Sequence, residues 1–248
     1  MSGANALGLF IVLAILGLML TIAFLTRKME SISLREITAF TRLNRAIGLA
    51  VEAGSRLHVS LGRGQMLGKQ SAIGFVGLSI LDRIGRSTSI SDRPPIATSG
   101  EGTLGILSQD SQRVTAKYLG VQSDPAQGRI TGITPYSFAA GTLSFIQDED
   151  IGANILIGNY GNEVVLITDA ADQQEGMTLG GTDNLTGQAV LFAAAQEPLI
   201  GEEPYAGGAY LGAGKMHTAS LYVQDIIRWV LIALILLGAL YKLFAGVL

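Results

Sequence analysis

Two long apolar runs, one near each end of the chain, constrain the fold of this protein more than any other feature. Residues 6–25 form a run of twenty without a charge, and residues 229–248 form a second run of twenty whose single charge is Lys242. Twenty helical residues rise about 30 Å, the thickness of the hydrocarbon core of a bilayer. The sequence therefore predicts two transmembrane helices, with the intervening chain held at a membrane surface.

The flanks of the first run favour a retained anchor and indicate its orientation. A cleaved signal peptide has a basic segment before its apolar core and a small-residue cleavage site after it, and neither is present here. Basic residues instead gather after the first run and directly before the second: Arg27, Lys28, Arg35, Arg42, Arg45 and Arg228. The positive-inside rule then predicts that both termini lie outside and the large loop lies in the cytoplasm.

Composition excludes several classes of chemistry. The chain has no cysteine, so disulfides, thiolate metal sites and cysteine nucleophiles are excluded. Its net charge of −3 gives no general signal for nucleic acid. The two histidines are His58, in an expected strand where packing or hydrogen bonding is the favoured role, and His217, near the second apolar run. Ser60 lacks the G-x-S-x-G context of a hydrolase nucleophile. No catalytic residue is therefore assigned.

Two acidic clusters are weak candidates for binding Mg²⁺ or Ca²⁺ through carboxylate oxygens. They comprise Asp148, Glu149 and Asp150 in one turn, and Asp169, Asp172 and Glu175 near another. Neither has the spacing of an EF-hand loop, and acidic turns between a helix and a strand are usually solvated. The sequence therefore predicts no metal site.

Periodicity divides the chain into five segments. We expect the first transmembrane helix over 1–26, a juxtamembrane amphipathic helix within 27–55, an α/β domain over 56–197, a Gly/Tyr-rich loop over 198–217, and a helix over 218–248 that continues into the second span. Ser33 and Glu36 match a capping box for the amphipathic helix, and Gly54 is a stop signal. Packing of this helix on the domain is favoured over contact with the membrane or another subunit.

Short apolar runs alternate with helical stretches through the α/β segment. The expected strands are 57–61, 95–98, 129–133, 154–157 and 176–179, and the expected helices are 69–86, 103–119, 137–147, 161–173 and 184–195. Alternation of this kind is typical of a parallel sheet covered on both faces. We predict a three-layer, Rossmann-like α/β domain with a mostly parallel sheet of about five strands, whose order the sequence leaves open.

The loop from Gly62 to Gly68 (GRGQMLG) follows the first expected strand and opens a helix. It is close to the dinucleotide fingerprint G-x-G-x-x-G but one residue longer. Glycines there would admit a pyrophosphate to the helix N-terminus, and Arg63 would add a positive charge. The acidic residue expected about 20 positions later is missing, although Glu101 has the corresponding topological place. A tight strand-to-helix turn explains the same glycines.

Glycine-bearing turns also follow three later strands, and ligands of parallel sheets bind at the carboxyl ends of strands. The candidate binding residues for a cofactor of unknown identity are therefore Gly62, Arg63, Gly64, Gly68, Gly100, Gly102, Gly158, Gly161 and Gly181. Short connections explain these glycines equally well, because glycine adopts positive φ at little cost.

Several stretches together resemble a known family: SLREI at 33–37, LHVSLG at 57–62, DRPPI at 92–96, NILIG at 154–158, GGT at 180–182, AYLG at 209–212 and SLYVQDIIRW at 220–229. The chain resembles an uncharacterised bacterial family of two-span membrane proteins of unknown function, associated with green non-sulfur bacteria. The resemblance covers nearly the whole chain. It implies a double anchor in the bacterial inner membrane around one α/β domain, and it transfers no catalytic residue.

Two functions from different classes follow. The favoured one is a non-catalytic, membrane-tethered binding or scaffolding module that self-associates, since confinement to a plane raises its effective concentration. The alternative is a nucleotide- or dinucleotide-binding enzyme or sensor that uses the glycine-rich loops. A transporter subunit is disfavoured, because the two spans carry one charge. The expected partners are the lipid bilayer, further copies of the chain and other membrane proteins, without nucleic acid.

Overall fold

The computed structural model describes residues 3–26, 35–68, 71–88, 93–122 and 124–245. It divides into two compact units, of which the first comprises Met1–Arg35 with Gly214–Leu248 and the second comprises Glu36–Ala213. The helices of the first unit are the two terminal ones, and the second unit is the α/β domain.

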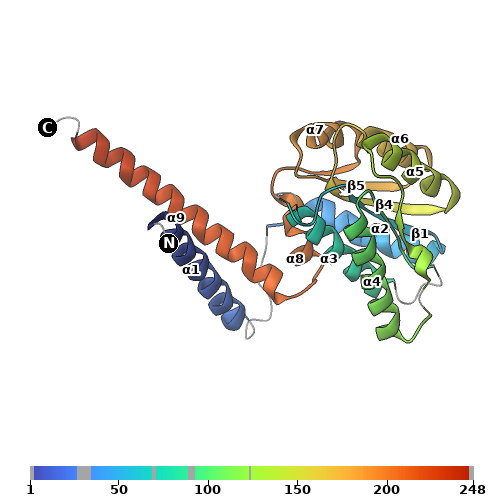
Figure 1. The fold of residues 1–248 in the computed structure, drawn as a ribbon, viewed down its shortest axis with the longest axis horizontal. Coiled ribbons are helices and arrows are strands. Elements are labelled where there is room, and N and C mark those ends of the chain that lie inside the picture. Colours follow the sequence, from blue (N-terminus) through green and yellow to red (C-terminus); the bar gives the residue numbers. More distant parts are fainter. Residues whose placement is uncertain (1–2, 27–34, 69–70, 89–92, 123, 246–248) are drawn as a thin grey trace. The chain divides into compact units, whose positions relative to one another are not determined.

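The first unit is built from α1 (Gly3–Thr26) and α9 (Lys215–Ala245). Within it the two helices contact each other and run in opposite directions (Figure 1). Both are long and apolar enough to span a membrane, by length and composition. The helix expected from residue 218 begins at Lys215 and continues without a break through the second apolar run.

The second unit contains a six-stranded sheet that is parallel throughout. Its strands are β1 (Arg56–Gly62), β2 (Ile96–Ser99), β3 (Gly128–Ile130), β4 (Ile151–Asn159), β5 (Met177–Gly181) and β6 (Glu197–Leu199). The predicted three-layer α/β fold is confirmed, with one strand more than expected. The extra strand, β6, is three residues long and contains Pro198, which an edge strand tolerates because one side of its ladder is free.

The strand order is β3-β2-β1-β4-β5-β6, so the chain builds outward from β1, crosses back to β4 and builds outward again. Right-handed crossovers place the helices of the two halves on opposite faces. One face carries α2 (Thr38–Ala53), α3 (Ser71–Ser87), α4 (Gly102–Leu119) and α8 (Gly207–Tyr210). The other face carries α5 (Pro135–Asp148), α6 (Val164–Gln173) and α7 (Leu185–Ala194) (Figure 1).

Alternation along the strands produces a separate apolar core on each face. On β1, Leu57, Val59 and Leu61 belong to the core beneath α2 and α3. On β4, Leu156 belongs to the second core, together with Phe138 of α5 and its neighbours from α6 and α7. The central strands are therefore buried on both faces, as expected for a parallel sheet.

The amphipathic helix starts later than the sequence predicted. Ser33 lies outside the described residues, and Glu36 precedes the helix, which begins at Thr38 without a side-chain cap. The capping-box prediction is therefore wrong at Glu36. The stop signal is confirmed, since Gly54 has a φ of +69° and its N–H bonds to carbonyls of the last turn. The buried face of α2, which includes Phe40 and Leu43, packs on the sheet, as the favoured interpretation required.

The stretch predicted as a Gly/Tyr-rich loop contains the end of β6, a 3₁₀ turn η2 (Glu203–Ala206), α8 and the start of α9. A second 3₁₀ turn, η1 (Pro125–Gln127), precedes β3. Tyr210 stacks on Phe40 of α2, with ring centroids 5.1 Å apart. A Cβ on Gly207 would lie 2.7 Å from Ile80 of α3. The segment between β6 and α9 therefore packs against its own domain.

Candidate functional site

The strand order reverses between β1 and β4, and this switch point is where doubly wound sheets bind ligands. The two strand ends lie very close together here. Gly62 has a φ of +67°, and a Cβ on it would lie 2.6 Å from the carbonyl oxygen of Asn159. A Cβ on Gly158 would collide with the carbonyl oxygen of Leu61. Both glycines are therefore required by the approach of the two backbones to each other.

The loop after β1 is tied to both neighbouring strands by its backbone. The carbonyl oxygen of Gly62 accepts a hydrogen bond from the N–H of Gly100 at 2.9 Å, and the N–H of Arg63 donates to the carbonyl oxygen of Asn159 at 3.0 Å. In a dinucleotide site the backbone of this loop approaches the pyrophosphate. Here the carbonyl oxygen of Gly62 and the N–H of Arg63 already form hydrogen bonds with the backbone of neighbouring segments.

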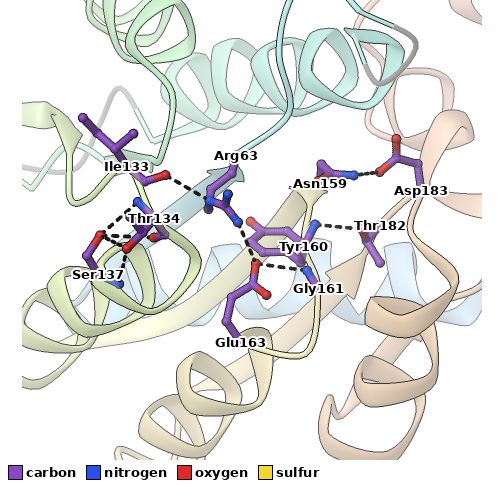
Figure 2. Close-up of polar contacts among 10 residues, drawn as sticks. All are labelled: Arg63, Ile133, Thr134, Ser137, Asn159, Tyr160, Gly161, Glu163, Thr182 and Asp183. Carbon is purple, nitrogen blue, oxygen red and sulfur yellow. Dashed lines mark hydrogen bonds and ion pairs between the residues drawn. The ribbon is translucent and has the colours of Figure 1, made fainter.

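Arg63 and Glu163 form an ion pair across the switch point (Figure 2). Arg63 Nη1 lies 3.6 Å from Glu163 Oε1, and Arg63 Nε donates to the carbonyl oxygen of Ile133 at 3.4 Å. The Glu163 side chain is 3% exposed and that of Arg63 is 26% exposed. The guanidinium therefore bridges the loop that precedes α5 and the start of α6.

Glu163 immediately precedes α6, and its Oε1 also accepts the N–H of Gly161 at 3.0 Å. Backbone N–H groups at a helix N-terminus are a favourable environment for an anion, and bound phosphates commonly lie there. In this protein the Glu163 carboxylate lies just before α6, where it accepts the N–H of Gly161 and caps no N–H of the helix itself. Glu163 was not among the predicted site residues, because it falls inside the helix expected over 161–173. The sequence signal that could have indicated Glu163 is an acidic residue two positions after Gly161, a glycine in the turn that follows β4.

Three other helices that begin at this edge, α4, α5 and α7, are capped by side chains of the chain itself. Glu101 Oε2 accepts the N–H of Leu104 at 2.8 Å at the start of α4. Thr134 and Ser137 form a capping box on α5 (Figure 2), and Asn184 Oδ1 accepts the N–H of Thr186 at 3.0 Å on α7. These caps satisfy N–H groups that a bound phosphate would otherwise use.

Glu101 has the topological place of the acidic residue that binds ribose in dinucleotide domains, directly after β2. Burial acts to raise the pKa of Glu101, but hydrogen bonds from Leu104 and Thr103 outweigh it and lower the pKa below its ordinary value. The carboxylate is thus charged at neutral pH and engaged as a helix cap.

Two further contacts link β4 to the loop after β5 (Figure 2). Asn159 Nδ2 donates to Asp183 Oδ1 at 2.7 Å, and the N–H of Tyr160 donates to Thr182 Oγ1 at 3.1 Å. The hydroxyl of Tyr160 donates to the carbonyl oxygen of Ser60 at 2.7 Å inside the domain. Burial raises the pKa of Tyr160, so this phenol stays protonated and acts as a structural donor.

The structure thus places the predicted glycines in different environments. Gly62, Gly100, Gly158 and Gly161 surround Arg63 and the ends of β1 and β4, each with protein atoms where a Cβ would stand. Gly181 packs against Pro204, with 2.8 Å from a built Cβ to Pro204 Cγ, and Gly64 is buried in the loop after β1. Gly102 has no atom within 4 Å of a built Cβ, and Gly68 has none nearer than 3.8 Å.

His58 lies at the centre of the sheet in a buried polar chain that crosses three strands. Its Nδ1 is 2.9 Å from Asn154 Oδ1 on β4, and its Nε2 is 2.8 Å from Thr98 Oγ1 on β2. Burial lowers the pKa of His58 to about 4, with partial opposition from the Asn154 hydrogen bond, so the ring is neutral at pH 7. The prediction of a packed, hydrogen-bonded histidine is confirmed.

One of the acidic clusters is engaged in ion pairs. Glu149 Oε2 lies 3.1 Å from Arg56 Nη1, and Asp150 Oδ2 lies 3.2 Å from Arg93 Nη1. Among the described residues, no three histidine, aspartate or glutamate side chains gather in a group that could hold a metal ion. Carboxylates of the turn that precedes β4 therefore form ion pairs with Arg56 of β1 and with Arg93, which precedes β2.

A shallow hollow of about 180 Å³ lies at the start of α2. It is lined by Glu36, Thr38, Thr41, Arg42 and Arg45. Arg42 forms an ion pair with Glu197 of β6. None of the predicted binding residues lines this hollow.

Comparison with known proteins assigns the whole chain to one group. A family model described as "Domain of unknown function (DUF6754)" matches residues 2–248. No curated protein and no solved structure matches the chain.

Proposed function

We propose that this chain, which belongs to the DUF6754 family of domains of unknown function, is a non-catalytic, membrane-tethered binding or scaffolding module that self-associates. In this proposal α1 and α9 hold it in the inner membrane of a bacterium, with the α/β domain in the cytoplasm and both termini outside. The placement rests on the apolar length of the two helices and on the basic residues that flank them.

The observation that carries the proposal is the ion pair of Arg63 with Glu163 at the switch point. A phosphate bound there would have to displace the Glu163 carboxylate from the N–H of Gly161 and from Arg63. Otherwise it would be repelled by a buried negative charge beside it. The edge of the sheet that binds cofactors in related architectures is thus held together by the side chains of this chain.

Double anchoring favours self-association. Two spans confine the domain to a plane, which raises the local concentration of its copies. Gly8 and Gly17 of α1 have no atom within 4 Å of a built Cβ, so their surfaces are free for close helix packing with another chain.

We expect the full chain, purified in a mild detergent, to be a defined oligomer. Its protein mass, measured by light scattering with the detergent contribution subtracted, should be a whole multiple of 26.0 kDa. Dilution should shift this mass toward the monomer, because association is governed by mass action. A monodisperse monomer at every concentration, in detergent and in lipid nanodiscs alike, would contradict the proposal.

A nucleotide- or dinucleotide-binding enzyme or sensor is the second candidate. The observation in its favour is the strand order, which is that of dinucleotide-binding domains, with a glycine-rich loop after β1. This function requires the side chain of Glu163 to move away from the switch point when a phosphate binds.

A further inference from the structure

We infer that the hollow at the start of α2 binds the headgroup phosphate of an anionic phospholipid in the bilayer that holds this chain. This inference rests on the membrane anchoring in the proposed function and adds a lipid-binding site on the α/β domain. The hollow is lined by Glu36, Thr38, Thr41, Arg42 and Arg45. The last four follow the spacing i, i+3, i+4 and i+7, which places them on one side of the helix.

The hollow offers positive charge and hydrogen-bond donors to an anion. Arg45 is exposed and forms no ion pair with any residue that the structure describes. Arg42 pairs with Glu197 of β6, but its side chain is 65% exposed and its guanidinium has further N–H donors for a second anion. The first turn of α2 has no side-chain cap, so its backbone N–H groups are also able to donate to a phosphate.

The size of the hollow restricts what it can hold. Its volume is about 180 Å³, whereas pockets for drug-sized ligands have volumes of roughly 300–1,000 Å³. A single phosphate group therefore fits the hollow better than a whole nucleotide does. Glu36 is the acidic member of the lining, and its carboxylate repels a phosphate, so removal of this charge should strengthen binding.

The chain enters and leaves the α/β domain beside this hollow. α1 ends at Thr26 and α2 begins at Thr38, so the connecting chain reaches at most about 43 Å even when fully extended. At the other connection, Tyr210 of α8 stacks on Phe40 in the first turn of α2, and α9 begins at Lys215. Both tethers therefore leave the domain near the start of α2, which gives the bilayer a high effective concentration at the hollow.

The distribution of charge along the chain favours an anionic lipid over a soluble partner. Residues 27–45 contain five basic and two acidic residues, whereas residues 46–213 contain 9 basic and 17 acidic residues. An anionic leaflet attracts the first segment and repels the rest of the domain. A soluble acidic protein or a nucleic acid would have to approach a domain with a large excess of carboxylates, while the bilayer adjoins the basic segment through the chain itself.

The test is a titration of the detergent-purified full chain with phosphatidylglycerol, which is anionic, and with phosphatidylcholine, which is zwitterionic, read by native mass spectrometry as bound lipid. Wild type should bind phosphatidylglycerol more tightly than phosphatidylcholine. Arg45→Gln should lower the affinity for phosphatidylglycerol about fivefold, the contribution of one basic residue near an anionic surface, and Glu36→Gln should raise it. Arg45 is changed because Arg42 also holds Glu197. Lys117→Gln removes the same charge at an exposed position of α4 and should have no effect.

Inorganic phosphate and poly-glutamate, titrated in parallel, distinguish the other sources of an anion. If either binds wild type more tightly than phosphatidylglycerol does, and binding is lost in Arg45→Gln, the hollow serves a soluble anion or an acidic protein and the inference is overturned. Equal affinity for the two lipids, or an unchanged affinity of Arg45→Gln for phosphatidylglycerol, overturns it as well. Each of these outcomes leaves the membrane anchoring in place. Recovery of the full chain from cells in the soluble fraction would instead contradict the anchoring, and with it the proposed function.

Discussion

Replacement of Gly158 by alanine should lower the free energy of unfolding of the protein by about 3 kcal/mol or more, with no ligand present. The new methyl group would collide with the carbonyl oxygen of Leu61, which lies in the backbone of the adjacent strand β1. A backbone oxygen in a central strand cannot rotate away as the end of a side chain can. We therefore expect β1 and β4 to separate, which would disrupt the centre of the sheet.

Gly102→Ala is the matched control, because the sequence placed both glycines in the same candidate site. A Cβ on Gly102 has no atom within 4 Å, and the residue begins α4. Alanine there should leave stability unchanged or raise it by up to about 1 kcal/mol. Urea unfolding of each full-length variant in detergent, followed by circular dichroism, gives the comparison. Equal stability of the two variants would show that the strand ends do not pack as described.

Acidification from pH 6.5 to pH 4 should remove about 3 kcal/mol of folding stability through His58 alone. Burial lowers the pKa of His58 from 6.5 to about 4 in the folded protein. The unfolded chain then takes up a proton below pH 6.5 while the folded domain does not. This contribution to stability is therefore complete above pH 6.5, declines as the pH falls, and is lost at about pH 4.

The measurement is the free energy of unfolding between pH 7.5 and pH 4 for wild type and for His58→Gln, whose amide replaces the imidazole between Asn154 and Thr98. The variant will be less stable at pH 7, but its pH profile should be flatter by about 3 kcal/mol. Parallel profiles for wild type and His58→Gln would contradict a neutral, buried His58.

Most of the fold could be predicted from the sequence because the five expected strands each carried a local signal. Apolar runs such as 57–61 and 154–157 lie within β1 and β4, and Gly54 ends α2 as expected. The short strand β6 could not be found, because its pairing with β5 depends on a tertiary contact and not on its own composition. The strand order was likewise beyond local reasoning, since crossovers of either direction have similar lengths.

In the candidate site too, the features set by local sequence could be predicted, and those set by strand pairing could not. The sequence indicated which loops lie at the carboxyl edge, because parallel strands all end there. It gave no indication that Gly62 and Gly158 are required by the backbone of the neighbouring strand, since the pairing of β1 with β4 joins residues far apart in the chain. The pairing of Arg63 with Glu163 has the same cause. Gly62 and Gly158, which were predicted to bind a ligand, therefore have a structural role that becomes visible only when the strand order is known.

We propose that side chains of this chain hold together the switch point that would otherwise bind a nucleotide. The most direct test is calorimetric titration of the full-length protein in mild detergent with NAD, NADP, ATP, GTP and nucleotide sugars, alongside Gly64→Val as the variant that would block the loop after β1. We expect no saturable heat of binding from either protein at ligand concentrations up to about 1 mM. Saturable micromolar binding by wild type that is abolished by Gly64→Val would contradict the claim and establish the nucleotide-binding alternative.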